Sequence, residues 1–262
     1  MKPSLAIVVM SCDRYADLWA PFFEMFFRHW RDCPCPVYLV ANEAASPDPR
    51  VTVLRAGPDE GWSATLKRCL AQLPADNVFT MIDDAFLVEP IHTAEFMRWY
   101  AWFIARDAHY LRLRAAPPPD VRVDGEVGEI VPGSMYRTSA VFAFWRRKTL
   151  FGLLDERENA WQFELDGVAR ADRIRGFYGV YRSRISYVHG VDRGRWFPWA
   201  VARLRAAGVK VDTTARPMMT AGQALRFVTN LPKAVVMSRI SSSWRSRLIR
   251  WKRAARHAMR ER

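Results

Sequence analysis

The chain has 262 residues, of which 50% are hydrophobic and 26% are charged, a composition typical of a folded globular protein. No stretch approaches the roughly 20 consecutive apolar residues of a membrane-spanning helix, so we expect no transmembrane segment. The net charge is +13, and residues 233–262 alone hold ten basic residues against one acidic residue.

The N-terminal part of the sequence alternates apolar runs with segments of helical periodicity. Strands are predicted at 4–13, 35–43, 50–56 and 79–84, and helices at 16–30 and 61–74. Strands that alternate with helices favour right-handed β-α-β units and an α/β fold with a mostly parallel sheet flanked by helices. Ligands of such sheets bind outside the carboxyl ends of the strands.

The following segment begins with a predicted helix. Thr93 is its expected N-cap, and Phe96, Trp99, Tyr100 and Phe103 form its apolar face. Short strands over 121–144 are expected to extend the same sheet. Further predicted elements are helices at 147–154 and 160–172, a strand at 183–190 and a helix from Pro198 to Gly208. We predict one catalytic domain over 1–230 and a basic amphipathic helical tail over 231–262.

Two adjacent carboxylates, Asp83 and Asp84, end the strand at 79–84. Burying both without a partner would cost several kcal/mol, because like charges repel and carboxylates lose hydration. A divalent cation that bridges to phosphate oxygens would relieve this cost. The alternative, that one aspartate caps a helix, is weakened because the next predicted helix begins near Thr93.

The order of these elements, with GWSATLKRCL, MIDDAFL, YRTSAVFAFWRRKTL and AWQFEL, resembles GT-A-fold bacterial glycosyltransferases of surface-polysaccharide biosynthesis, over roughly residues 4–215. The resemblance implies a GT-A-like fold and an enzyme that moves a sugar from a nucleotide-sugar donor to a glycan or lipid-linked acceptor. The family's acidic signature is D-x-D, whereas Ala85 follows Asp84 here. Use of Mn²⁺ or Mg²⁺ is therefore left open.

The resemblance also implies roles for individual residues. Glu164 would be the general base of an inverting reaction, preferred to Asp166 because Trp161 and Phe163 flank it. Asp84 and His189 would be metal ligands, with Asp84 also catalytic, and Gly190 would let the chain approach a phosphate. The expected donor-binding residues are Ser11, Asp13, Arg14, Asn42, Trp62, Lys67, Asp83, Arg193 and Arg195. The expected acceptor-binding residues are Tyr136, Ser139 and Trp161.

Structural roles remain open for several of these residues. Glu164 is equally explained as a carboxylate favoured by the start of a helix, and His189 as a structural strand-end histidine. Arg193 and Arg195 could hold a diphosphate through charge-assisted hydrogen bonds or lie in a solvated loop.

The tail over 240–262 places Trp244, Leu248, Trp251 and Ala255 at helical spacing among arginines. Such a segment suits an anionic membrane surface, and the alternative interpretation is a solvated, partly disordered tail. Few cysteines and no recognisable signal peptide predict a cytoplasmic protein, peripheral on the inner face of the plasma membrane. Two alternatives remain: a nucleotidyltransferase, although SCDRYADLW lacks the expected glycines, and a non-enzymatic binding module for nucleic acid or acidic polymer. We do not expect nucleic acid as a partner, because the body of the protein is only mildly basic.

Overall fold

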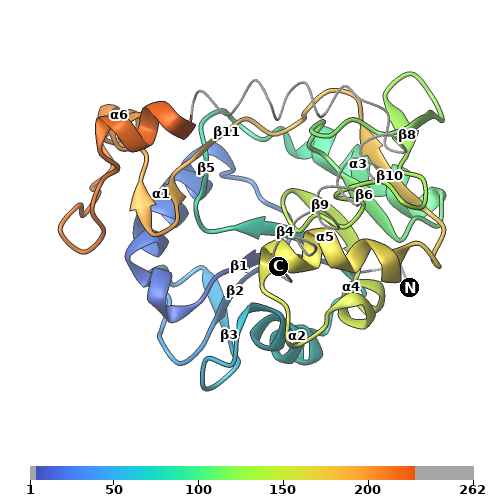
Figure 1. Ribbon diagram of the computed structural model, residues 1–262, viewed down its shortest axis with the longest axis horizontal. Helices are drawn as coiled ribbons and strands as arrows, with labels where there is room; N and C mark the ends of the chain where they lie inside the picture. Colours follow the sequence, from blue (N-terminus) through green and yellow to red (C-terminus); the bar gives the residue numbers. More distant parts are fainter. Residues whose placement is uncertain (1–3, 228–262) are drawn as a thin grey trace, which may run out of the picture.

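The first strand, β1 (Leu5–Met10), is buried along its whole length because helices cover both of its faces. The computed structural model describes residues 4–227 (Figure 1). Alternate residues of β1 point to opposite faces. Leu5, Ile7 and Val9 pack in one core with α1 (Trp19–His29) and α3 (Thr93–Ala105). Val8 and Met10 pack in a second core with α2 (Trp62–Gln72), α4 (Arg147–Leu153) and α5 (Ala160–Ala171).

The main sheet has nine strands in the order β3-β2-β1-β4-β9-β6-β10-β8-β7. Its first half, β3 (Val51–Arg55), β2 (Val37–Ala41), β1 and β4 (Asn77–Ile82), is entirely parallel. β9 (Ala143–Arg146) lies antiparallel between β4 and β6 (Tyr110–Arg112), and β6 pairs in parallel with β10 (Phe177–Val180). β8 (Val127–Glu129) and β7 (Val121–Arg122) close the edge. The predicted α/β class, a sheet flanked by helices on both faces, is confirmed, and the second half does extend the same sheet.

Two small sheets lie outside the main one. β5 (Ala85–Leu87) pairs antiparallel with β11 (Tyr187–His189), with His189 opposite Ala85. β12 (Val191–Asp192) and β13 (Arg195–Trp196) form a hairpin, which leads to α6 (Pro198–Ala206). The β5–β11 pairing brings residue 189 beside the carboxylates at 83 and 84.

Most predicted helices are confirmed, with two differences at their starts. The helix expected over 16–30 begins as a 3-10 helix, η1 (Asp13–Leu18), before α1. The N-cap of α3 is His92 and not Thr93, whose hydroxyl instead accepts a hydrogen bond from Trp30 Nε1 at 2.9 Å. The four predicted apolar residues of α3 are buried, as expected.

No helix within residues 4–227 has the length and apolar character needed to cross a membrane. The tail over 231–262 lies outside the described residues, so its helical form and the domain boundary at 230 stay predictions.

Candidate active site

A pocket of about 580 Å³ opens at the carboxyl ends of β1 and β4. The sheet continues in opposite directions from these two strands, since β2 lies beyond β1 and β9 beyond β4. Such a switch in strand order is where open α/β sheets bind ligands. The predicted residues that line the pocket are Ser11, Arg14, Trp62, Asp83 and Asp84. Lining residues that the sequence did not single out include Cys12, Tyr15, Asp59 and Thr65.

Two buried oxygen atoms of the lining residues have no hydrogen-bond partner within the described part of the chain, Asp84 Oδ1 and Thr65 Oγ1. A buried polar atom without a partner costs about 1–3 kcal/mol, and most such atoms in folded proteins are paired. Both atoms belong to residues that line the pocket, so a polar ligand there would lie close to them. The sequence could have indicated Thr65 as a pocket residue, because it lies three residues after Trp62 and therefore on the same side of α2.

Asp83 lies at the end of a hydrogen-bond chain that starts in α1. Trp19 Nε1 donates to Ser11 Oγ at 2.6 Å, and the Ser11 hydroxyl donates to Asp83 Oδ2. Burial and the neighbouring charge of Asp84 raise the pKa of Asp83 well above its usual value, and the Ser11 hydrogen bond only partly opposes this. The site thus holds a carboxylate that lacks a full counter-charge.

Asp84 is the second carboxylate, and burial raises its pKa as well. His189 opposes this rise, with Nε2 at 3.6 Å from Asp84 Oδ2. The backbone carbonyl of Asp84 also accepts a hydrogen bond from the N–H of Gly190 at 2.7 Å. Packing explains the glycine, because a Cβ at 190 would collide with the Phe86 ring.

Arg216 supplies positive charge near both carboxylates, and the sequence analysis missed it. Its Nε and Nη2 donate to the two carboxylate oxygens of Asp17 at 2.9 and 2.8 Å, and Nη2 also donates to the Arg14 carbonyl. The guanidinium lies 4.4 Å from the centre of the Tyr15 ring. Arg216 is 7% exposed, so it fixes the η1 side of the pocket from a segment 199 residues away in sequence.

Asp13 and Asn42 support the pocket wall instead of lining it. The Asp13 carboxylate accepts backbone N–H groups of Asn42, Glu43 and Ala44 at 2.8–2.9 Å. Asn42 Oδ1 accepts the Asp13 N–H at 3.2 Å. Both side chains therefore tie the end of β1 to the end of β2.

Three predicted donor-binding cations are not among the residues that line the pocket. Lys67 Nζ pairs with Glu156 Oε1 at 3.1 Å, so it faces the loop before α5. Arg193 is exposed in the turn of the β12–β13 hairpin, and Arg195 follows it. Arg216 is the cation that influences both carboxylates, and the β12–β13 hairpin lies next to it through Gly194.

A second polar cluster lies on α5, which contributes Ala160 to the pocket. Glu164 is one helical turn beyond Ala160, and its Oε1 accepts the Ser139 hydroxyl at 2.8 Å and the Ala140 N–H at 3.3 Å. Burial raises the pKa of Glu164, while these hydrogen bonds and Arg114 oppose the rise. The Tyr136 hydroxyl accepts a hydrogen bond from Trp161. All three predicted acceptor residues thus gather around the predicted base.

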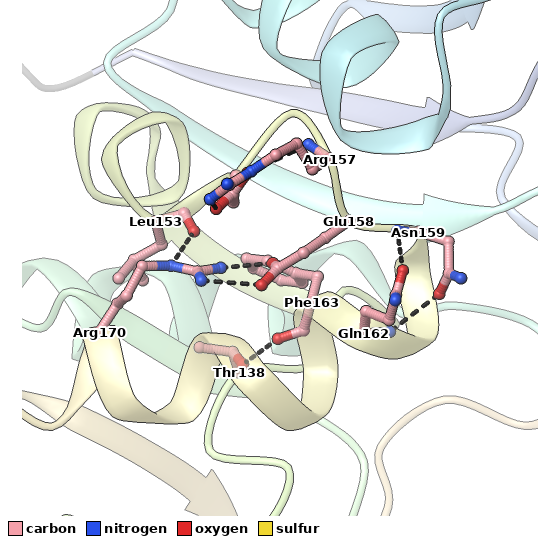
Figure 2. Close-up of polar contacts among 9 residues, drawn as sticks. Thr138, Leu153, Arg157, Glu158, Asn159, Gln162, Phe163 and Arg170 are labelled. Carbon is pink, nitrogen blue, oxygen red and sulfur yellow. Dashed lines mark hydrogen bonds and ion pairs between the residues drawn. The ribbon is translucent and has the colours of Figure 1, made fainter.

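Several contacts fix α5 beneath the pocket (Figure 2). Asn159 and Gln162 form a capping box at its N-terminus, with both hydrogen bonds at 2.9 Å. Further along the helix, Arg170 makes a bidentate ion pair with Glu158, and Thr138 Oγ1 donates to the Phe163 carbonyl at 3.0 Å. The rigid helix holds Trp161 and Glu164 at fixed positions.

The carboxylate site fits a cation that is shared with phosphate. Oxygen and imidazole ligands suit Mn²⁺, and Mg²⁺ usually takes one or two carboxylates plus phosphate oxygens and water. Asp84, with its unpartnered oxygen, and His189 offer two such ligands. Residues 4–227 hold no group of three or more acidic, histidine or cysteine side chains placed for a metal, so phosphate would have to complete the coordination.

No protein-family model matches the sequence, and no curated protein matches it. Solved structures with a similar course of the chain include S. aureus TarS 1-349 in complex with UDP, at 14% identity and a TM-score of 0.41, covering 71% of this chain and 59% of that one. The mannosyltransferase PcManGT from Pyrobaculum calidifontis in complex with GDP-Man and Mn²⁺ has 14% identity and a TM-score of 0.49. The alignment covers 97% of this chain and 81% of the mannosyltransferase chain. A UDP-glucose pyrophosphorylase from Acinetobacter baumannii has 10% identity and a TM-score of 0.46. The alignment covers 89% of this chain and 99% of the pyrophosphorylase chain.

The chain covers 60% of the length of S. aureus TarS 1-349 and 36% of that of a longer TarS chain. At identities of 14% or less and TM-scores below 0.5, these likenesses assign neither a family nor an activity.

Proposed function

We propose that this protein is a glycosyltransferase that moves a sugar from a nucleotide-sugar donor to a glycan or lipid-linked acceptor. The observation that carries the proposal is the pocket at the β1–β4 switch point, which holds two buried carboxylates and two unpartnered buried oxygens. Glu164, Ser139, Tyr136 and Trp161 add a second polar cluster one helical turn away along α5.

In this proposal the nucleotide diphosphate lies in the pocket against Asp84, with the positive charge of Arg216 and the imidazole of His189 close to that carboxylate. A bound Mn²⁺ or Mg²⁺ would neutralise negative charge on the leaving diphosphate. Trp62 and Ser11 line the part of the pocket that would receive the nucleoside. Trp161, with an exposed indole face, and Ser139 would position the acceptor sugar.

Glu164 would act as the general base of an inverting displacement. The acceptor hydroxyl oxygen bonds to the anomeric carbon while its proton passes to Glu164. The bond between the anomeric carbon and the diphosphate oxygen breaks, and the nucleoside diphosphate leaves with those electrons. Burial raises the pKa of Glu164, which suits a group that must take a proton.

The setting we propose is bacterial surface-polysaccharide assembly on the inner face of the plasma membrane. The supporting feature is the basic, tryptophan-containing segment 240–262, which lies outside the described residues and suits an anionic bilayer.

The proposal is tested with a panel of nucleotide sugars in thermal shift, each with and without Mn²⁺. A true donor should raise the melting temperature as its concentration passes the dissociation constant. Asp84→Asn should abolish this shift in Mn²⁺ and lower turnover by roughly 100-fold or more, because the diphosphate loses its carboxylate–cation contact. Asp212→Asn, at an exposed aspartate that is not among the residues lining the pocket, is the control and should behave as wild type.

Product analysis separates the proposal from a nucleotidyltransferase. A glycosyltransferase releases a nucleoside diphosphate, whereas a nucleotidyltransferase acting in reverse consumes pyrophosphate and releases a nucleoside triphosphate and a sugar phosphate. Pyrophosphate-dependent formation of the triphosphate would replace the proposed activity with the second one.

A further inference from the structure

The segment from Trp196 to Phe227 presents most of the exposed large apolar side chains of the described protein. Among residues 4–227 there are five such side chains, and three of them are Trp199, Met218 and Leu225, exposed by 39%, 43% and 63%. The other two, Val121 and Trp161, lie on other elements. A group of exposed apolar side chains marks a surface that contacts a partner.

A small core lies in this segment and supports one of the three side chains, Trp199. Phe197 is buried, stacks on Trp199 with ring centres 4.5 Å apart, and contacts Phe227 at 4.6 Å. Met219 packs in the same core, directly after exposed Met218. Residues 221–227 are helical, and Thr220 and Gln223 exchange capping hydrogen bonds at the start of this helix. The surface is therefore part of the fold.

The same segment of the chain is rich in basic residues. Residues 193–227 contain seven basic residues and one acidic residue, Asp212. Arg203 lies four residues after Trp199 on α6, hence on the same side of the helix, and both Arg203 and Arg205 are exposed. In Figure 1, α6 forms the left edge of the molecule, next to α1.

We propose that this docking face, formed by Trp199, Met218, Leu225, Arg203 and Arg205, binds an anionic lipid bilayer surface. Tryptophan and leucine side chains are stable at the boundary between headgroups and acyl chains, and arginine pairs with anionic headgroups. A second copy of the chain is disfavoured as the occupant, because it would bring two basic faces together. The face also leads directly into residues 233–262, whose ten basic residues favour the same partner.

The docking face lies close to the carboxylate site. Phe197, which supports Trp199, also contacts the His189 ring at 5.7 Å, and His189 Nε2 lies 3.6 Å from Asp84 Oδ2. If the proposed sugar transfer holds, a lipid-linked acceptor in the same bilayer would lie near the site. The docking itself does not depend on that reaction, since it is measured without donor or acceptor.

The test is flotation of the full-length protein with vesicles of equal parts phosphatidylglycerol and phosphatidylcholine, and with phosphatidylcholine alone. We expect binding to the anionic vesicles only. The double variants Met218→Ser/Leu225→Ser and Arg203→Gln/Arg205→Gln should each weaken it by about fivefold or more, since they remove interfacial apolar area and charge respectively. Trp199 is left intact because it stacks on the small core.

Two matched controls lie elsewhere on the molecule. Arg173→Gln/Arg175→Gln removes the same charge at the same spacing from exposed positions between α5 and β10, on the right of Figure 1. Trp161→Ser removes an exposed tryptophan from α5. Both should bind vesicles nearly as tightly as wild type.

The proposal is overturned if either docking-face variant binds as the controls do, because the tail alone would then hold the protein on the bilayer. It is also overturned if Met218→Ser/Leu225→Ser changes the sedimentation mass but not vesicle binding, which would make the face a contact between copies. If that double variant melts at a lower temperature than wild type, the single variant Leu225→Ser replaces it in the flotation assay. Leu225 is the most exposed of the three positions, and its substitution should also weaken vesicle binding.

Discussion

Asp83 and Asp84 place two neighbouring carboxylates in a buried position, which costs stability. For an acid whose pKa is raised in the folded state, the folded protein holds the proton more tightly than the unfolded chain does. The free energy of unfolding therefore falls as pH rises from the usual aspartate range toward the raised pKa values. Such a cost is typical of a site that is shaped for a ligand.

Asp83→Asn should therefore stabilise the protein at neutral pH while it impairs donor binding. The amide keeps an oxygen for the Ser11 hydroxyl but carries no charge next to Asp84. We expect the melting temperature at pH 8 to rise by about 2–4 °C, or ~1 kcal/mol for a domain of this size. The gain should shrink toward pH 4, where wild-type Asp83 is already protonated. Asp59→Asn, at a more exposed carboxylate of the same pocket, is the control and should give no such gain.

Glu164→Gln should lower the rate of transfer by roughly 100-fold or more, because the amide cannot accept the proton. The amide oxygen can still accept the Ser139 hydroxyl, so the fold and donor affinity should be retained. In the wild-type enzyme, the rate should fall with decreasing pH at a value above the usual glutamate range, since burial raises this pKa. Steady-state rates of the wild type and the variant over a pH series measure both the loss of rate and its pH dependence. If Glu164→Gln instead weakened donor binding and left the turnover number unchanged, Glu164 would be a binding residue.

At the scale of single elements, α5 connects the two halves of the candidate site. Its first residue, Ala160, lines the pocket, while Glu164 and Trp161 belong to the acceptor cluster. The capping box of Asn159 and Gln162 begins the helix at the position that this double role requires. The sequence marks this start, because Asn followed three residues later by Gln is a recognisable capping pattern.

Asn159→Ala should lower the free energy of unfolding by about 1 kcal/mol, because the N–H of Gln162 loses its acceptor. A frayed first turn would also displace Trp161 and so raise the KM for the acceptor more than the KM for the donor. Denaturant unfolding and initial-rate kinetics measure the two effects. Asn159→Ser keeps an acceptor oxygen at the cap and should recover most of both losses; no recovery would show that the cap does not act through α5.

At the scale of the whole molecule, the described body and the basic tail have separate roles in our proposals. Deleting residues 240–262 should weaken binding to anionic vesicles, most strongly at low salt, where charges are least screened. Thermal shift with a soluble donor should be unchanged, because the deletion keeps every pocket residue of the described part of the chain, from Met10 to Ala160. Flotation over a salt series tests this expectation, and a truncated protein that binds as tightly as the full chain would contradict the role of the tail.

The first half of the fold could be predicted from the sequence because its signals are local. Apolar runs with a polar end gave β1, β2 and β4, and helical periodicity gave the buried face of α3. The placement of Asp83 and Asp84 at the carboxyl end of β4 followed directly, because it needs only the end of one strand. The prediction of the first helix missed the 3-10 helix η1, and the predicted N-cap of α3 was wrong. The second error arose because Thr93 contacts a distant residue, Trp30, instead of capping the helix.

The sequence by itself determined the α/β class, the first four strands of the main sheet and the carboxylate pair at the end of a buried strand. It did not predict β6 and β10, which lie in the same sheet. Only the tertiary structure decided which cation lies near that pair. The sequence analysis named Lys67, Arg193 and Arg195 as donor-binding cations, whereas Arg216 lies near the carboxylates and is 199 residues away from its partner Asp17 in sequence. In the tertiary structure the Asp13 carboxylate accepts hydrogen bonds from backbone N–H groups. The pairing of β5 with β11 places His189 beside Asp84. The physical reason is range: hydrophobic periodicity acts over a few residues, whereas the charge around a buried carboxylate depends on whichever distant segments pack against it.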